Sequence, residues 1–187
     1  MSNPTKIMVI RHAEKPAKSG SPLGVSTDGN KDSESLIVDG WQRAGGLACF
    51  FAPTSGPLQN SKLANPQFLY ASGIAHHSHS KRPQETITPL SNKLNLAINT
   101  QYLKEDYESM VESALKCDGV VLICWEHQDI PAIANQILNN TTTSPQNWPG
   151  DRFDLVWVFD WDLAANAYTF SQVPQCLLAG DSPIIIT

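Results

Sequence analysis

The chain has 187 residues, of which 41% are hydrophobic and 17% charged, and its formal net charge at pH 7 is −5. This composition excludes a disordered chain, and the acidic balance argues against a nucleic-acid-binding protein, which normally carries a basic surface. The length suits one domain with a sizeable core. We therefore expect residues 1–187 to form a single domain.

Neither a targeting signal nor a membrane segment is predicted. The first residues are polar, and no apolar run approaches the ~20 residues of a membrane-spanning helix. The four cysteines are scattered without CxxC spacing, which is typical of reduced thiols: Cys49, Cys117, Cys124 and Cys176. We expect a cytoplasmic protein without a membrane partner.

The first predicted element is the apolar run Ile7–Ile10, which is short and largely β-branched. Such a run indicates a strand buried on both faces. Arg11 and His12 follow it directly. Because ligands of open α/β sheets collect beyond the carboxyl ends of the strands, a cation and an imidazole at this point favour an anionic ligand.

A loop and a helix are predicted next. Ala17–Val38 is rich in Gly, Ser, Asp and Lys and lacks apolar periodicity, which indicates a long loop beside the site, a candidate lid. A helix is expected over Asp39–Phe51, with Asp39 as its N-cap and Pro53 ending it.

The rest of the chain alternates strands and helices, which predicts an α/β domain with a mixed sheet. Val120–Cys124 is the strongest buried-strand pattern, and it leads into Glu126 and His127. The other expected elements are a strand at Gln67–Ala71, helices at Lys81–Leu94, Asp106–Lys116 and Ile130–Leu138, and an antiparallel pair at Leu155–Asp160 and Ala167–Val173.

Three strand ends therefore offer cations or imidazoles: Arg11–His12, the loop into Lys81–Arg82, and His127. Transfer of a phosphoryl group to an imidazole needs this combination. One nitrogen attacks phosphorus in line, while donors hold the equatorial oxygens as charge is redistributed. Arg suits the second task because its planar fork donates to two oxygens and stays charged.

Several motifs, in order along most of the chain, resemble those of the histidine phosphatase superfamily. They are Arg-His-Ala-Glu-Lys-Pro at 11–16, Gly-x-x-Arg-Ala at 40–44, Tyr-Ala-Ser at 70–72, the Arg-led helix start at 81–86, and the strand delivering a second His at 120–127. The resemblance implies a phosphoglycerate mutase-like fold, a three-layer α/β/α sandwich around a central mixed, mostly parallel sheet.

The resemblance also implies roles for individual residues. His12 is the expected nucleophile, and the phosphate pocket is formed by Arg11, Arg82 and His127. Expected substrate-binding residues are Glu14, Lys15 and Ser72.

The general acid is open. The family's usual acid positions fit this chain poorly, and Gln128 follows the second His where one branch has Asp. We favour Glu126, which is adjacent to His127, although strand alternation counts against it. The alternatives are Asp129, Glu105 and Glu108.

The expected function is hydrolysis of a small phosphomonoester through a phosphohistidine on His12, without cofactor or metal. A mutase-type phosphotransferase and a non-catalytic phosphate-binding module of the same fold are the alternatives. The cluster His76-His77-Ser78-His79 is expected to be a solvated loop, with a metal site as its alternative. The natural substrate and the oligomeric state are left open.

Overall fold

The structure, a computed structural model, describes residues 3–187 and contains one six-stranded sheet. The strands lie in the order β3-β2-β4-β1-β5-β6. Their bounds are β1 Lys6–Arg11, β2 Phe68–Ala71, β3 Ile98–Asn99, β4 Val120–Trp125, β5 Leu155–Asp162 and β6 Ala167–Pro174.

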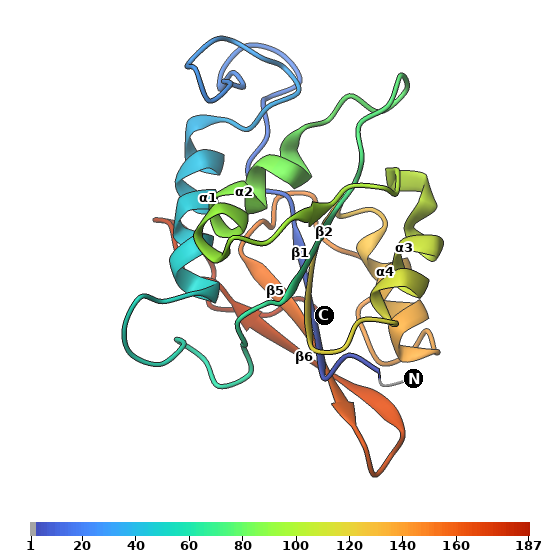
Figure 1. Ribbon diagram of the computed structural model, residues 1–187. Coiled ribbons are helices and arrows are strands. Elements are labelled where there is room, and N and C mark those ends of the chain that lie inside the picture. The colour runs from blue at the N-terminus through green and yellow to red at the C-terminus, as the bar shows by residue number, and fades with distance from the viewer. Residues whose placement is uncertain (1–2) are drawn as a thin grey trace.

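The sheet is mixed, as expected. The pairs β2·β3, β2·β4 and β1·β4 are parallel, whereas β5 runs antiparallel to both β1 and β6. Parallel strands need crossover connections, and the helices of this chain supply them. Figure 1 shows the β5–β6 hairpin extending from the end of the sheet that lies opposite the Ala17–Ile37 loop.

Helices cover both faces of the sheet, which gives the expected three layers (Figure 1). One face carries α1 and α2, which pack against each other, and the other carries α3 and α4. The helices span α1 Val38–Phe51, α2 Arg82–Leu94, α3 Tyr107–Ala114 and α4 Ile130–Leu138, and the short 3-10 helix η1 spans Lys104–Asp106.

The alternation of side chains along β1 explains its continuous apolar sequence. Ile7 and Val9 pack into the core beneath α3 and α4, whereas Met8 and Ile10 pack into the core beneath α1 and α2. All four side chains are fully buried. A strand that contributes to two cores has no polar face, so its first polar residues lie at its end, where Arg11 and His12 are found.

Four details of the secondary structure differ from expectation. Ile37, not Asp39, precedes α1, and Asp39 lies in the first turn. The α3 helix is shorter than predicted, because the chain enters it through η1 and ends it at Ala114. The β5–β6 hairpin is slightly longer than predicted. The two-residue strand β3 was not predicted, since a segment of that length shows no periodicity.

The start of α1 lies against the segment that follows the first strand. A Cβ added to Gly40 would lie 2.6 Å from the backbone oxygen of Glu14, closer than real Cβ atoms approach. The same oxygen accepts a hydrogen bond from the backbone N–H of Ile37. The glycine of the Gly-x-x-Arg-Ala motif therefore permits a close helix–loop contact.

Candidate active site

The predicted strand ends meet at one edge of the sheet. In the parallel register Arg11 on β1 lies opposite Trp125 on β4, and Cys124 lies opposite Ala71 on β2. The backbone N–H of His12 continues this ladder by donating to the oxygen of Trp125 at 3.0 Å. The residues that follow the three strands are therefore brought to a common edge.

Arg11 is fully buried and held along one side of its guanidinium group. Its Nη1 donates to the backbone oxygens of Gly150 at 2.8 Å and Arg152 at 3.0 Å, with a longer contact to Pro149. Nε and Nη2 are buried without a hydrogen-bond partner among the described residues. Burial lowers the pKa of Arg11 to about 10, so the group keeps its charge at neutral pH.

His12 is 3% exposed and has a defined tautomer. Its Nδ1 lies 2.8 Å from the backbone oxygen of Ala13, and a carbonyl oxygen only accepts, so Nδ1 carries the proton. Nε2 then holds a lone pair. Burial, reinforced by the charges of Arg11, Arg82 and Lys15, lowers the pKa of His12 to about 3. The imidazole is therefore neutral at pH 7, as a nucleophile requires.

Arg82 begins α2 and is linked to the segment containing His12. The hydroxyl of Thr86, one turn along α2, accepts from the backbone N–H of Ala13 at 2.8 Å and donates to the oxygen of Arg82 at 2.7 Å. The guanidinium donates through Nη1 to Ser80 Oγ and through Nη2 to the oxygen of Ser33. Its buried Nε has no partner among the described residues.

His127 lies two residues beyond the end of β4. Its Nδ1 is buried and unpartnered within the described chain, and a Cβ added to Gly150 would lie 3.7 Å from its Nε2. Gly150 therefore lies against His127 while its carbonyl binds Arg11. Burial, together with the charges of Arg11 and Lys15, lowers the pKa of His127 to about 4.

These contacts favour the predicted phosphate pocket, which stays a prediction. Within residues 3–187, six buried side-chain nitrogens or oxygens lack a partner, and four of them belong to Arg11, Arg82 and His127. Buried polar groups are rarely left unpaired, because each costs about 1–3 kcal/mol. Donors of this kind near a neutral imidazole with a free lone pair match the oxygens of a tetrahedral anion.

Of the expected substrate-binding residues, Lys15 lies within reach of the site. It is exposed, and partial desolvation together with the charges of Arg11 and Arg82 lowers its pKa. Ser72 is buried directly after β2, where its backbone oxygen accepts from the Gln84 amide. Their contact with a substrate stays a prediction.

Glu14 is engaged elsewhere. Both of its carboxylate oxygens accept hydrogen bonds from Arg43, at 2.7–3.1 Å, and Arg43 also binds Asp181 and Gln175. Arg43 is 2% exposed. The structure thus uses Glu14 to fix the segment after His12 to α1 and the C-terminal region. The sequence motif contained Arg43, but the partner 29 residues away was missed.

The four candidate acids lie at different places. The negative charge of Glu126 partly opposes the lowering of the pKa of Arg11 and of Lys15, so Glu126 lies within electrostatic reach of both cations. The strand β4 ends at Trp125. Glu126 begins a turn in which its backbone oxygen accepts a hydrogen bond from the Asp129 N–H. The alternation of side chains along a strand therefore does not determine the direction of the Glu126 side chain.

The contacts of the other three candidate acids relate them less directly to Arg11 and Lys15. Burial and the charge of Glu126 raise the pKa of Asp129, which is half-buried. Glu105 is exposed on η1 beside His77, and Glu108 is exposed on α3. Glu126 therefore remains the favoured acid, as a prediction.

The loop 149–153 contributes to the site and was missed by the sequence analysis. Its carbonyls bind Arg11, and the ring of Phe153 lies 6.2 Å from that of His12. The segment Pro149-Gly150-Asp151-Arg152 has a polar, Gly/Pro composition that indicates only a loop. No pattern in it indicated a functional role.

The Ala17–Ile37 loop is attached to α2 at several points. Lys81 pairs with Asp32 at 2.6 Å, and Glu85 accepts from the Ser35 hydroxyl and the Leu36 N–H. Ser33 also contributes the carbonyl that binds Arg82. The loop thus lies beside the site, and its action as a lid stays a prediction.

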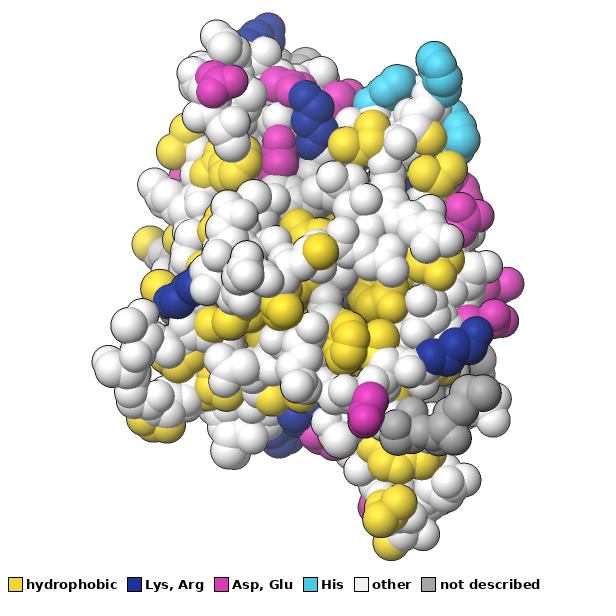
Figure 2. Space-filling view, viewed as in Figure 1, with side chains coloured by type: hydrophobic (Ala, Val, Ile, Leu, Met, Phe, Trp, Pro, Cys, Tyr) yellow, Lys and Arg dark blue, Asp and Glu magenta, His cyan; other side chains and the backbone are white. Residues whose placement is uncertain are grey.

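The histidine cluster lies on the surface. His76, His77 and His79 are exposed, and the imidazole groups visible in Figure 2 gather at one end of the molecule. His77 lies 3.7 Å from the carboxylate of Glu105. Within residues 3–187, no three His, Cys, Asp or Glu side chains come together as metal ligands. None of the helices described has both the length and the apolar character needed to cross a membrane.

No protein-family model and no curated protein matches the sequence. Solved structures do match. A candidate α-ribazole-5′-P phosphatase from Escherichia coli has a TM-score of 0.58 at 11% identity, covering 92% of this chain and 97% of that chain. A candidate phosphohistidine phosphatase SixA from Agrobacterium tumefaciens has a TM-score of 0.53 at 17% identity, covering 90% of this chain and 96% of that chain.

A third structure, a phosphoserine phosphatase variant from Entamoeba histolytica in complex with phosphoserine, has a TM-score of 0.52 at 11% identity, covering 92% of this chain and 97% of that chain. These likenesses extend over nearly the whole of each molecule, so they concern the complete architecture. The chain has the α/β fold of these phosphatase structures, the phosphoglycerate mutase-like fold that the motifs in its sequence predicted.

Proposed function

We propose that this protein is a phosphomonoester hydrolase that acts through a phosphohistidine on His12. The observation that carries the proposal is the set of unpartnered buried donors of Arg11, Arg82 and His127 around an imidazole whose Nδ1 is already protonated. We further propose that residues 1–187 form one catalytic domain, because strands from both halves of the chain build the single sheet.

The first step transfers the phosphoryl group to the enzyme. Nε2 of His12 attacks phosphorus, the N–P bond forms, and the ester P–O bond breaks in line with it. The leaving oxygen takes a proton from Glu126. The free N–H groups of Arg11 and Arg82, with His127, hold the equatorial oxygens while charge is redistributed.

The second step restores the enzyme. Water attacks phosphorus, gives a proton to the carboxylate of Glu126, and releases inorganic phosphate, so that the His12 lone pair is regenerated. The hydrogen bond from Nδ1 to the Ala13 oxygen stabilises the positive charge that the phosphorylated ring carries. Guanidinium groups supply the charge stabilisation that a metal ion provides in other phosphatases.

The test is hydrolysis of p-nitrophenyl phosphate by the wild type and by His12→Ala. We expect turnover by the wild type and a loss of about 10³-fold or more in His12→Ala, because no other group replaces the nucleophile. His76→Ala, in the exposed cluster, is the matched control and is expected to retain full activity. Circular dichroism checks that each variant folds.

Binding measurements separate the alternatives. Inorganic phosphate or vanadate is expected to raise the Tm, since a ligand at 100 times its Kd stabilises by about 2.7 kcal/mol. Binding without turnover would favour a non-catalytic phosphate-binding module. Transfer of the phosphoryl group to an added alcohol in preference to water would favour a phosphotransferase. Absence of both binding and turnover would contradict the proposal.

A further inference from the structure

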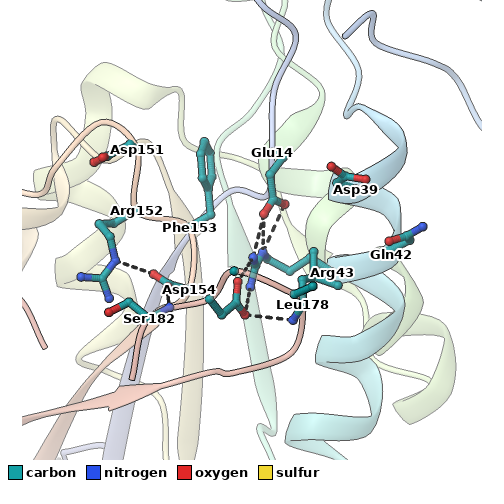
Figure 3. Close-up of a pocket in the computed structure, with 13 residues that line it drawn as sticks. Glu14, Asp39, Gln42, Arg43, Asp151, Arg152, Phe153, Asp154, Leu178 and Ser182 are labelled. Atoms are coloured by element: carbon teal, nitrogen blue, oxygen red, sulfur yellow. Dashed lines mark hydrogen bonds and ion pairs between the residues drawn. The ribbon is translucent and has the colours of Figure 1, made fainter. Parts of the chain in front are cut away.

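The segment that contains His12 is held by residues of two helices. Figure 3 shows Arg43 reaching from α1 to Glu14, which accepts its hydrogen bonds. On the other side, the backbone N–H of Ala13 donates to the hydroxyl of Thr86 on α2 at 2.8 Å. The proposed nucleophile is therefore attached to regular, well-packed elements of the fold.

Arg82 is held differently, because its guanidinium group contacts two loops. Nη1 donates at 3.0 Å to the hydroxyl of Ser80, in the loop after β2, and Nη2 donates at 2.7 Å to the backbone oxygen of Ser33, in the Ala17–Ile37 loop. The carboxylate of Glu34 lies 3.7 Å from the same Nη2. The third nitrogen, Nε, is buried without a partner among the described residues. The two loops thus fix the plane of the guanidinium and leave Nε for a ligand oxygen.

The Ala17–Ile37 loop is in turn held by Glu85, in the first turn of α2. Its carboxylate accepts hydrogen bonds from the Ser35 hydroxyl at 2.7 Å and from the backbone N–H of Leu36 at 2.9 Å. Ser35 and Leu36 are fully buried, and Glu85 is half-buried. The carboxylate therefore binds the loop two and three residues after Ser33, whose carbonyl contacts Arg82.

Lys81 makes a second connection between the loop and α2. Its ammonium group pairs with Asp32 at 2.6 Å, but Lys81 is exposed, and exposed ion pairs contribute little to stability. Its backbone N–H also donates to the oxygen of Glu34, a bond that does not depend on the side chain. Hydrogen bonds to a half-buried carboxylate are stronger than an ion pair in water, so Glu85 is the side chain on which the loop position depends most.

We propose that Glu85 and Ser80 are positioning residues for phosphoryl transfer. Ser80 fixes Arg82 directly, and Glu85 fixes it through residues 33–36, so that Nε binds an oxygen of the transferred phosphoryl group. The inference rests on the proposed function and goes beyond it, because both residues act through Arg82. The guanidinium lies within electrostatic reach of the nucleophile, since its charge contributes to lowering the pKa of His12.

The test is a double-mutant cycle on kcat/KM for p-nitrophenyl phosphate. Glu85→Ala removes the carboxylate and Ser80→Ala the hydroxyl, each in the wild type and in Arg82→Ala. Glu85→Gln and Ser80→Thr are the conservative variants, because a side-chain amide can still bind both groups of the loop and threonine keeps the hydroxyl. Glu112→Ala, at an exposed acid on α3, is the matched control.

We expect Glu85→Ala to lose about 10-fold and Ser80→Ala about 5-fold in kcat/KM, mainly through kcat, since misplacing a group that binds the transition state lowers the rate. In Arg82→Ala both losses should shrink to less than about twofold, because residues that act through one group are non-additive. The conservative variants should stay within about twofold of the wild type. Vanadate binding, measured by the rise in Tm, gives the same cycle without turnover.

The outcomes separate the two proposals. A loss that is equal in the two backgrounds, or no loss at all, would overturn the positioning role of the residue concerned and leave the phosphatase function standing. No hydrolysis by the wild type, with no phosphate binding, would overturn both. Circular dichroism checks folding, and because Ser80 is partly exposed, its variants decide the proposal even if Glu85→Ala does not fold.

Discussion

The guanidinium group of Arg11 lies on the ring of Phe153, with Cζ 3.8 Å from the ring centroid. The ring fixes the plane of the guanidinium, and the backbone carbonyls of Gly150 and Arg152 fix its rotation by binding Nη1. The remaining edge, Nε and Nη2, is left for a ligand. Two parallel N–H groups held in this way match two oxygens of a phosphate group.

Arg11→Lys is therefore expected to lower kcat/KM for p-nitrophenyl phosphate by about 10²–10³-fold. Lysine keeps the charge but not the two parallel donors or the contact with the ring. Steady-state kinetics measure the loss, and Arg152→Lys, whose side chain is directed to Asp154, is the control. Near wild-type activity in Arg11→Lys would show that only its charge matters.

Two imidazoles are expected to stay neutral well below neutral pH. Burial lowers the pKa of His12 to about 3 and that of His127 to about 4, so two of the five imidazole groups should remain neutral at pH 5 in the free protein. NMR of the ring nitrogens measures this directly, with His12→Gln and His127→Gln for assignment. Titration of His12 near pH 6.5 would contradict its burial in the site.

These low pKa values also make folding stability depend on pH. The unfolded chain binds protons on these imidazoles below about pH 6.5, and the folded chain does not until much lower pH, so stability falls as pH decreases from 7 toward 4. Urea unfolding at pH 7 and pH 5 measures the decrease. It should be smaller in the double variant His12→Gln/His127→Gln.

Arg43→Met is expected to lower the free energy of unfolding by about 3–5 kcal/mol, because it leaves the buried carboxylate of Asp181 and that of Glu14 without their cation. Hydrogen bonds from Arg43 hold the pKa of Asp181 low in spite of its burial. Urea denaturation measures the change, and Lys116→Met, an exposed cation, is expected to have no measurable effect. Equal stability of the two variants would mean that the ion-pair network contributes little.

Glu126→Gln is expected to affect substrates according to their leaving groups. An aryl oxide leaves with little protonation, whereas an alkoxide needs a proton, so activity on propyl phosphate should fall about 10²-fold or more and activity on p-nitrophenyl phosphate much less. Asp129→Asn, at a half-buried acid close by, is the comparison. A larger leaving-group effect in Asp129→Asn would assign the acid to Asp129.

The central strands of the sheet could be predicted because a strand buried on both faces has a continuous apolar sequence. Met8 and Ile10 face one core and Ile7 and Val9 the other, so the middle of β1 favours an unbroken apolar run. The parallel order of the strands then brings the residues after β1 and β4 together. For this reason Arg11, His12 and His127 could be proposed from sequence as parts of one site.

The ion pairs and the loop contacts could not be predicted. Arg43 and Glu14 are 29 residues apart, and no periodic pattern relates a helix residue to a loop residue at that distance. Phe153 and Gly150 lie in a loop whose composition indicates only irregular structure. Their positions depend on the path of the chain from α4 to β5, which packing of the whole domain determines.

The most direct test of the account is to quench the enzyme during turnover of p-nitrophenyl phosphate under alkaline conditions, digest it with trypsin and locate the phosphoryl group by mass spectrometry. Cleavage after Arg11 gives a peptide of residues 12–18 in which His12 is the sole histidine. We predict the phosphoryl group on this peptide, and none on the protein in His12→Ala. Turnover with the phosphoryl group on another residue, or undiminished in His12→Ala, would contradict the mechanism.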